Sequence, residues 1–135
     1  MIYSVDVEIR TPVLATEVTD RVIDAITTLF PDAEIEREGE GLLARTHSLD
    51  HFSEHLYRQE ILDSARNRFF DGRDGEAFEF RLKKQPAFQG VVNFAVGEPD
   101  ELGDISVRVH VRDPSLEEYV DHVAPPTEEG EPIEP

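Results

Sequence analysis

The chain has 135 residues, with 30 Asp and Glu against 13 Lys and Arg, a formal net charge of −17 and no cysteine. This length supplies one hydrophobic core and excludes a catalytic domain with a separate lid, and the lack of cysteine excludes disulfides and thiolate metal sites. With no apolar run as long as a membrane span and no signal-peptide pattern at the N-terminus, we expect a soluble, cytoplasmic protein that makes no contact with a membrane.

The first part of the chain predicts a strand followed by a helix. Apolar and polar residues alternate over residues 3–10, which is the period of a half-buried strand, and Pro12 ends this run. Apolar residues then recur at helical spacing over residues 16–30. Thr16 is the predicted N-cap of this amphipathic helix, and Pro31 stops it.

A hairpin and two helices are predicted next. Residues 33–38 and 41–46 read as two short strands joined through glycines. Ser48 is a good N-cap for the helical pattern that runs over residues 49–70. The apolar residues of its two halves lie on nearly opposite faces, so we predict a break near Tyr57–Gln59.

Three more strands and a short helix complete the expected elements. Alternation predicts strands over residues 78–83, 91–95 and 105–111, the last two paired as a hairpin. The segment 84–90, KQPAFQG, is expected to be a loop, and residues 115–122 a short helix.

These elements predict an α+β domain over residues 1–122. Strands with one polar face indicate a mostly antiparallel sheet, with helices packed on one face to give two layers. The tail, residues 123–135, is rich in proline and glutamate and is expected to be disordered.

The one enzyme-like pattern is HFSEH, residues 51–55, which sets two histidines and Glu54 on one predicted helix. The spacing is that of an H-x-x-E-H zinc site. A catalytic zinc also needs a third ligand and a pocket that excludes water, and the other three histidines are poorly placed or remote in the sequence. We therefore interpret His51 and His55 as solvated residues on a polar helix face, and expect no metal, no cofactor and no enzymatic activity.

Positive charge is concentrated in one part of the sequence. Residues 58–84 hold seven of the 13 basic residues beside six acidic ones, so this window is close to neutral in an otherwise acidic chain. A polyanion could approach there; alternatively, the arginines pair with neighbouring carboxylates. The following residues add amides and Phe88, which can hydrogen-bond phosphates or stack on an unpaired base, at about 1–3 kcal/mol per stacked base. Phe94 alternates with core positions and is expected to be buried.

Two runs in this region, RQEILDSARNRFF and KKQPAFQGVVNF, resemble a small archaeal family of otherwise uncharacterised proteins. Members of that family are predicted to bind RNA and to share the fold of the ribosomal protein that binds five-S RNA. The resemblance covers residues 1 to about 112, with Pro86 where the family pattern has alanine. It implies an RNA-binding surface that includes Arg58, Gln59, Arg66, Lys83, Lys84, Gln85, Phe88 and Asn93.

The acidic composition of the chain indicates a solvent of high salt concentration. Self-repulsion destabilises so charged a chain in dilute buffer, whereas about 1 M salt screens charges over roughly 3 Å. Only Lys83 and Lys84 among the basic residues are lysines. An acidic, lysine-poor composition is typical of proteins dissolved in molar salt, so we infer a halophilic cytoplasm, with an ordinary acidic protein as the alternative.

We therefore predict a non-catalytic RNA-binding protein that acts near ribosomal or other structured RNA. The alternative is a protein-interaction or self-association module, for instance a homodimer. In that case a strand edge or the arginine-rich helix would pair with an acidic partner.

Overall fold

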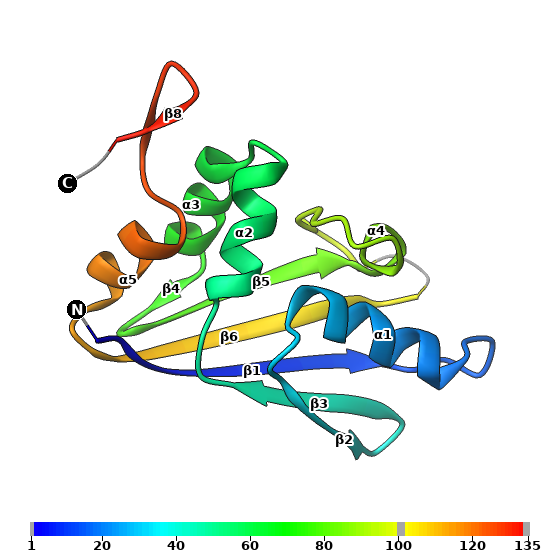
Figure 1. Ribbon diagram of the computed structural model, residues 1–135. Coiled ribbons are helices and arrows are strands. Elements are labelled where there is room, and N and C mark those ends of the chain that lie inside the picture. The colour runs from blue at the N-terminus through cyan, green and yellow to red at the C-terminus, as the bar shows by residue number, and fades with distance from the viewer. Residues whose placement is uncertain (1, 100–101, 134–135) are drawn as a thin grey trace.

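The computed structural model describes residues 2–99 and 102–133 as an α+β fold of two layers, as predicted (Figure 1). Six strands form an antiparallel sheet: β1 (Ser4–Pro12), β2 (Glu34–Glu38), β3 (Gly41–Thr46), β4 (Arg73–Asp74), β5 (Ala77–Lys83) and β6 (Asp104–Asp113). The helices are α1 (Thr19–Leu29), α2 (Asp50–Arg58), α3 (Leu62–Asp71), α4 (Lys84–Phe88) and α5 (Leu116–Val123). None of the helices in the described part of the chain is long and apolar enough to cross a membrane.

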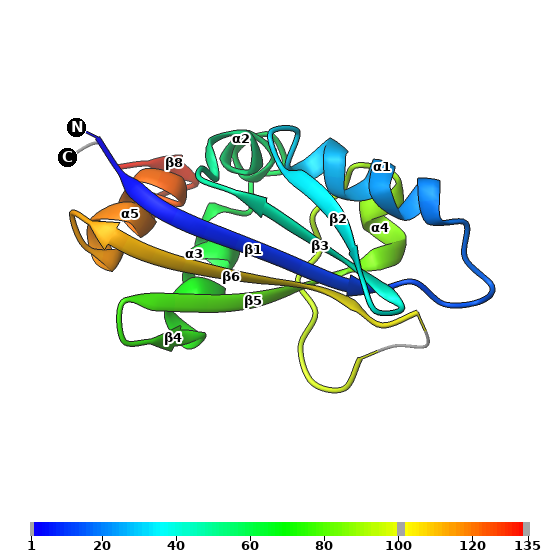
Figure 2. The same cartoon turned by 90° about the horizontal axis from the view of Figure 1, so that it is seen from below.

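The strand order is β2-β3-β1-β6-β5-β4, so β1 and β6, from opposite ends of the chain, lie side by side at the centre. Period two in the sequence decides which side chains are buried, since alternate residues of a strand point to opposite faces. Val7 and Val109 face each other across the central pair and are both buried. The helices cover this apolar face, and the other face of the sheet is left uncovered (Figure 2).

The first helix begins later than its sequence suggests. Thr16 was the predicted cap, yet α1 starts at Thr19 after Val18, without a side-chain cap. Residues 14–17 instead form a turn in which the Glu17 amide donates to the Leu14 carbonyl at 2.9 Å. The Glu17 carboxylate accepts from the Leu14 amide at 3.0 Å, and this turn delays the helix.

The predicted break between the second and third helices is confirmed. The chain leaves α2 through Gln59 and Glu60, and Glu60 adopts a positive φ of 57° before α3 begins. The break lets both apolar faces reach one core, because Leu56 and Phe69 are each fully buried. Ser48 accepts a hydrogen bond from the Asp50 amide at 3.0 Å, although Leu49 is the residue that directly precedes α2.

The segment between β5 and β6 differs from the prediction in two ways. The expected loop contains the short helix α4, and the expected strand over 91–95 is reduced to one bridge, Leu82↔Phe94. Two backbone bonds, Lys83 N to Asn93 O and Ala95 N to Arg81 O, hold this segment along the edge of β5. It forms no hairpin with β6 because both edges of β6 are already paired, with β1 and β5.

The C-terminal helix forms as predicted, with the Ser115 hydroxyl accepting from the Glu118 amide at 3.2 Å. Beyond it lies the segment that is rich in proline and glutamate. The short strands β7 (Thr127–Glu128) and β8 (Glu131–Pro132) pair with each other, and the Thr127 hydroxyl donates to Asp63 on α3. The last two residues of the predicted tail, 134 and 135, lie outside the described residues.

Candidate nucleic-acid interface

The uncovered face of the sheet carries the side chains that alternate with the buried core residues. Most of them are polar or charged, with the buried Leu43 as an apolar exception, and they come from five adjacent strands. The outward positions of these strands, in chain order, include Glu8, Arg10, Glu36, Glu38, Arg45, Glu79, Arg81, Lys83, Ser106, Arg108, His110 and Arg112. We call this surface the open face. It unites arginines from strands that are up to about a hundred residues apart in the sequence.

Strand register arranges these charges in rows across the sheet. One row runs through Arg45, Glu8, Arg108 and Glu79, so base and acid alternate over four neighbouring strands. The next row, two residues further along the strands, sets Ser106 of β6 between Arg10 and Arg81. The open face is therefore a two-dimensional array of opposite charges and not a positive stripe.

Ion pairs hold the central arginines in position. Arg10 donates from Nε to Glu38 Oε1 at 3.1 Å and from Nη1 to Glu8 Oε2 at 3.0 Å, and Arg108 donates to Glu79. The hydrogen bond to Glu38 raises the pKa of the Arg10 guanidinium, and the bond to Glu79 raises that of Arg108. These side chains are roughly half exposed, and water screens such pairs so that they stabilise the fold only weakly, which allows another anion to replace the carboxylates.

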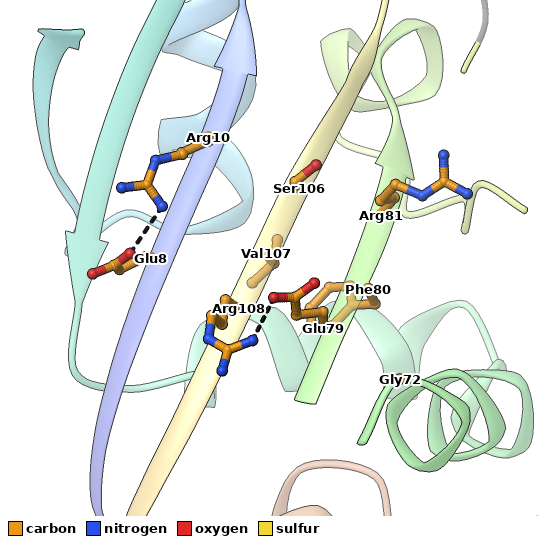
Figure 3. A pocket seen from close by; sticks show the side chains of 9 residues that line it. All are labelled: Glu8, Arg10, Gly72, Glu79, Phe80, Arg81, Ser106, Val107 and Arg108. Atoms are coloured by element: carbon orange, nitrogen blue, oxygen red, sulfur yellow. Dashed lines mark hydrogen bonds and ion pairs between the residues drawn. The ribbon is translucent and has the colours of Figure 1, made fainter. Parts of the chain in front are cut away.

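A hollow of about 370 Å³ opens on this face around the small side chain of Ser106 (Figure 3). It is lined by Glu8, Arg10, Gly72, Glu79, Phe80, Arg81, Ser106, Val107 and Arg108. The Arg81 guanidinium turns away from it, toward Asp104 Oδ2 at 2.8 Å and the Gly97 carbonyl at 2.7 Å. Arg10 and Arg108 are thus the cations that remain beside the Ser106 hydroxyl.

A neighbouring hollow, of about 520 Å³, continues the open face toward the other end of β1. Arg45 and Arg108 line it together with Asp6, His47 and His110. His47 Nδ1 lies 3.2 Å from Asp6 Oδ1, so positive charge can gather around this carboxylate when the imidazole is protonated. Both hollows offer hydrogen-bond donors to an anion.

Lys84, one of the eight residues that the family resemblance implies, is not on the surface. Its side chain is 0% exposed, and Nζ donates to the Pro12 carbonyl at 2.6 Å, the Leu102 carbonyl at 2.8 Å and Glu17 Oε1 at 3.0 Å. The Glu17 side chain is itself only 6% exposed. This ammonium ties three chain segments together and cannot reach a bound phosphate.

Two more of these residues also hold the fold together. The Gln59 amide makes two bonds with the backbone of Val92, at 2.9 Å to its carbonyl and 2.8 Å from its amide. Arg66 donates to Asp121 at 2.7 Å and to the Ala124 carbonyl at 3.2 Å, which links α3 to α5. Gln59 thereby anchors the segment after α4 to the helix break.

The remaining five lie on several elements and differ in exposure. Phe88 is half-buried, with the Arg21 guanidinium 5.4 Å from its ring centroid. Arg58, Lys83, Gln85 and Asn93 are exposed. Lys83 shares the outward alternation of β5, whereas Arg58 ends α2 in the helix layer. Phe94, expected in the core, is half-buried and packs edge-on against Phe69 and Phe80.

The histidines of HFSEH point to different partners. His51 Nε2 lies 3.6 Å from Asp32, while His55 Nε2 lies 3.3 Å from the Thr28 carbonyl. Among the residues that the structure describes, no group of three or more His, Asp or Glu is arranged to hold a metal ion. The geometry therefore favours the interpretation of these histidines as surface residues.

The basic window predicted from the sequence does not include most of the arginines that the sheet brings together. Arg10, Arg45, Arg108 and Arg112 all lie outside the basic window 58–84. The signal that could have found them is their position on the polar side of strand alternation. That signal is incomplete, because only strand pairing decides which of these arginines become neighbours.

The chain has relatives in sequence and in structure. A family model described as RNA binding matches residues 6–112. The chain is 37% identical over 136 positions to a UPF0201 protein of Thermococcus kodakarensis, with 96% of each chain covered. It is 40% identical over 131 positions to a UPF0200/UPF0201 protein of Archaeoglobus fulgidus, of which it spans 40% of the length.

Solved structures of similar proteins have the same fold. A crystal structure of a UPF0201 protein from Methanococcus jannaschii superposes with a TM-score of 0.86 at 32% identity, covering 96% of this chain and 99% of that one. A second crystal structure, of an uncharacterized UPF0201 protein, gives a TM-score of 0.84 at 38% identity, covering 95% and 99%.

Proposed function

From the premise that the chain belongs to the archaeal UPF0201 family and matches the family described as RNA binding, we propose that it binds RNA through the open face without catalysing a reaction. One observation carries the choice of surface. Arg10, Arg45 and Arg108 come from three adjacent strands and line neighbouring hollows in a chain whose net charge is −17. The proposed partner is ribosomal or other structured RNA in the cytoplasm of a halophilic archaeon.

Exchange of ion-pair partners explains how so acidic a protein can hold a polyanion. The carboxylates that pair with Arg10 and Arg108 are exposed, so their replacement by phosphate oxygens costs little. A guanidinium fork matches a phosphate in a bidentate manner and is less strongly hydrated than an ammonium. Six to ten phosphate contacts lose about 10³–10⁵ in affinity between 50 and 200 mM salt, so binding in molar salt must depend on such directional bonds.

The charges and lengths of the two edge strands favour this proposal over self-association through a strand edge. The edge strand β2 presents Glu34, Glu36 and Glu38, and like charges on an edge oppose pairing with another copy. The other edge of the sheet ends in β4, a strand of two residues. Neither edge is a long, flat and apolar template.

A titration followed by NMR tests the proposal. The intact chain is purified in about 2 M KCl, any bound RNA is sequenced, and that RNA is titrated into labelled protein. We expect amide shifts to concentrate in β1, β3 and β6. Shifts confined to the surroundings of Arg58, Gln85 and Asn93 would keep RNA binding but move it to the helix layer. Failure to retain either this RNA or added total RNA would overturn the function.

A further inference from the structure

The open face offers few aromatic rings to unpaired bases. In the described part of the sheet, no outward side chain is a phenylalanine or tyrosine, because the rings of Phe78 and Phe80 turn inward, with centroids 4.8 and 4.9 Å from that of Phe69. Among the outward positions of β6, the imidazole of His110 is exposed. Tyr57, 45% exposed, is the most exposed of the described phenylalanine and tyrosine residues, and it belongs to α2 in the helix layer. Proteins that hold single strands depend on the stacking of unpaired bases on aromatic side chains.

The alternation of charge is unexplained by phosphate binding alone. Glu8 lies between Arg45 and Arg108 in its row, at the centre of the array, and would repel a phosphate. The minor groove of double-helical RNA presents ribose 2′-hydroxyls beside the phosphates. A carboxylate can accept a hydrogen bond from a hydroxyl while its neighbouring guanidinium groups donate to phosphate oxygens. Alternating acid and base therefore match alternating hydroxyl and phosphate.

The dimensions of the array agree with a broad target. Neighbouring strands lie about 4.8 Å apart, so the row from Arg45 to Glu79 spans roughly 14 Å, and the two rows are separated by roughly 7 Å. Single-strand binders use a groove that tracks one backbone. The minor groove of an RNA double helix is wide and shallow, and a surface that extends in two dimensions can follow it.

We propose that the open face recognises double-helical RNA by its backbone, with Arg10, Arg45 and Arg108 on phosphates and Glu8 accepting from a ribose 2′-hydroxyl. This inference rests on the proposed function and names its substrate class. It accounts together for the lack of outward phenylalanine and tyrosine, the acid at the centre of the array and the breadth of the surface. A DNA double helix, which lacks 2′-hydroxyls, is the poorer ligand.

Three probes of equal length separate this inference from RNA binding itself. A perfect RNA duplex of about 16 base pairs, the span of known double-strand binders, is compared with an unstructured single-stranded RNA and a DNA duplex of the same sequence. We expect fluorescence anisotropy at 0.2 M KCl to give at least tenfold tighter binding of the RNA duplex than of either other probe. Equal or tighter binding of single-stranded RNA overturns the inference and leaves the proposed function standing. Binding of no RNA probe overturns the proposed function itself.

A variant of Glu8 tests the role of the 2′-hydroxyl. Glu8→Met removes the acceptor and one negative charge, and Glu54→Met on the exposed side of α2 is the matched control. We expect the preference for RNA duplex over DNA duplex to fall at least threefold in Glu8→Met and to stay unchanged in the control. If Glu8→Met tightens binding of both duplexes equally, Glu8 only repels phosphate and the inference is wrong.

Discussion

Lys84 and Arg10 are both cations with a carboxylate partner, but they have different roles in this molecule. The Lys84 side chain is 0% exposed and binds Glu17 and two backbone carbonyls, whereas the Arg10 side chain is 49% exposed and binds two carboxylates at the surface. Removing one partner of a buried pair leaves an uncompensated charge, while an exposed pair exchanges partners cheaply. Charges inside the core region thus hold the fold, whereas charges on the open face can exchange their partners.

The largest expected effect is on the buried side of this comparison. Lys84→Ala leaves Glu17 buried without a counter-charge and should lower the free energy of unfolding by about 3–5 kcal/mol. The measurement is urea unfolding in 2 M KCl. Replacement of the pair by apolar residues, Glu17→Leu with Lys84→Met, should recover only part of the loss, because the Leu14 amide and the Pro12 carbonyl also lose a hydrogen-bond partner. Unchanged stability of Lys84→Ala would mean that this ammonium does not hold the fold.

The second prediction is for the open face. Arg10→Gln with Arg108→Gln should weaken RNA binding about tenfold to hundredfold, because it removes two guanidinium groups that would donate to phosphate oxygens. Each factor of ten in affinity corresponds to about 1.4 kcal/mol. The free energy of unfolding should change by no more than about 1 kcal/mol. Arg37→Gln with Arg68→Gln lowers the net charge equally at positions away from the hollows and is the control for anisotropy titrations. Equal losses of RNA affinity in both double variants would mean that the arginines of the open face act only through the net charge of the protein.

A third, smaller effect concerns Gln59, which the family resemblance implies as an RNA contact. Because its amide makes two bonds with the Val92 backbone, Gln59→Ala should cost about 1–3 kcal/mol of stability and leave RNA affinity unchanged within twofold. Urea unfolding and anisotropy are measured on the same preparation. Lost affinity at unchanged stability would restore Gln59 to the interface.

The smallest expected effect is that of salt on the free energy of unfolding, and it should differ between the surface charges and the buried pair. Screening of 30 acidic side chains should raise the stability of the unmodified chain by about 1 kcal/mol or more between 0.2 and 2 M KCl. The cost of Lys84→Ala should stay the same in both salts, since buried pairs are screened much less. Equal stability of the unmodified chain in both salts would contradict the halophilic interpretation and favour an ordinary acidic protein.

Local periodicity in the sequence was enough to predict several of the elements. Alternation identified β1, β5 and β6, helical spacing identified α1, and the opposed apolar faces of residues 49–70 required the break after α2. Each of these patterns is complete within one segment, because the backbone period alone decides which side chains share a face. The two runs that resemble the RNA-binding family are local in the same sense.

Only the tertiary structure decided which charges became neighbours. Lys83 and Lys84 are adjacent in sequence, yet one lies on the surface and the other is buried, because α4 begins where β5 ends and turns Lys84 toward Glu17. Arg10 and Arg108 flank one hollow because β1, near the start of the sequence, pairs with β6, which lies far from it in the sequence. Strand register depends on long-range packing of the core, so no count of charges along the sequence could have located this surface.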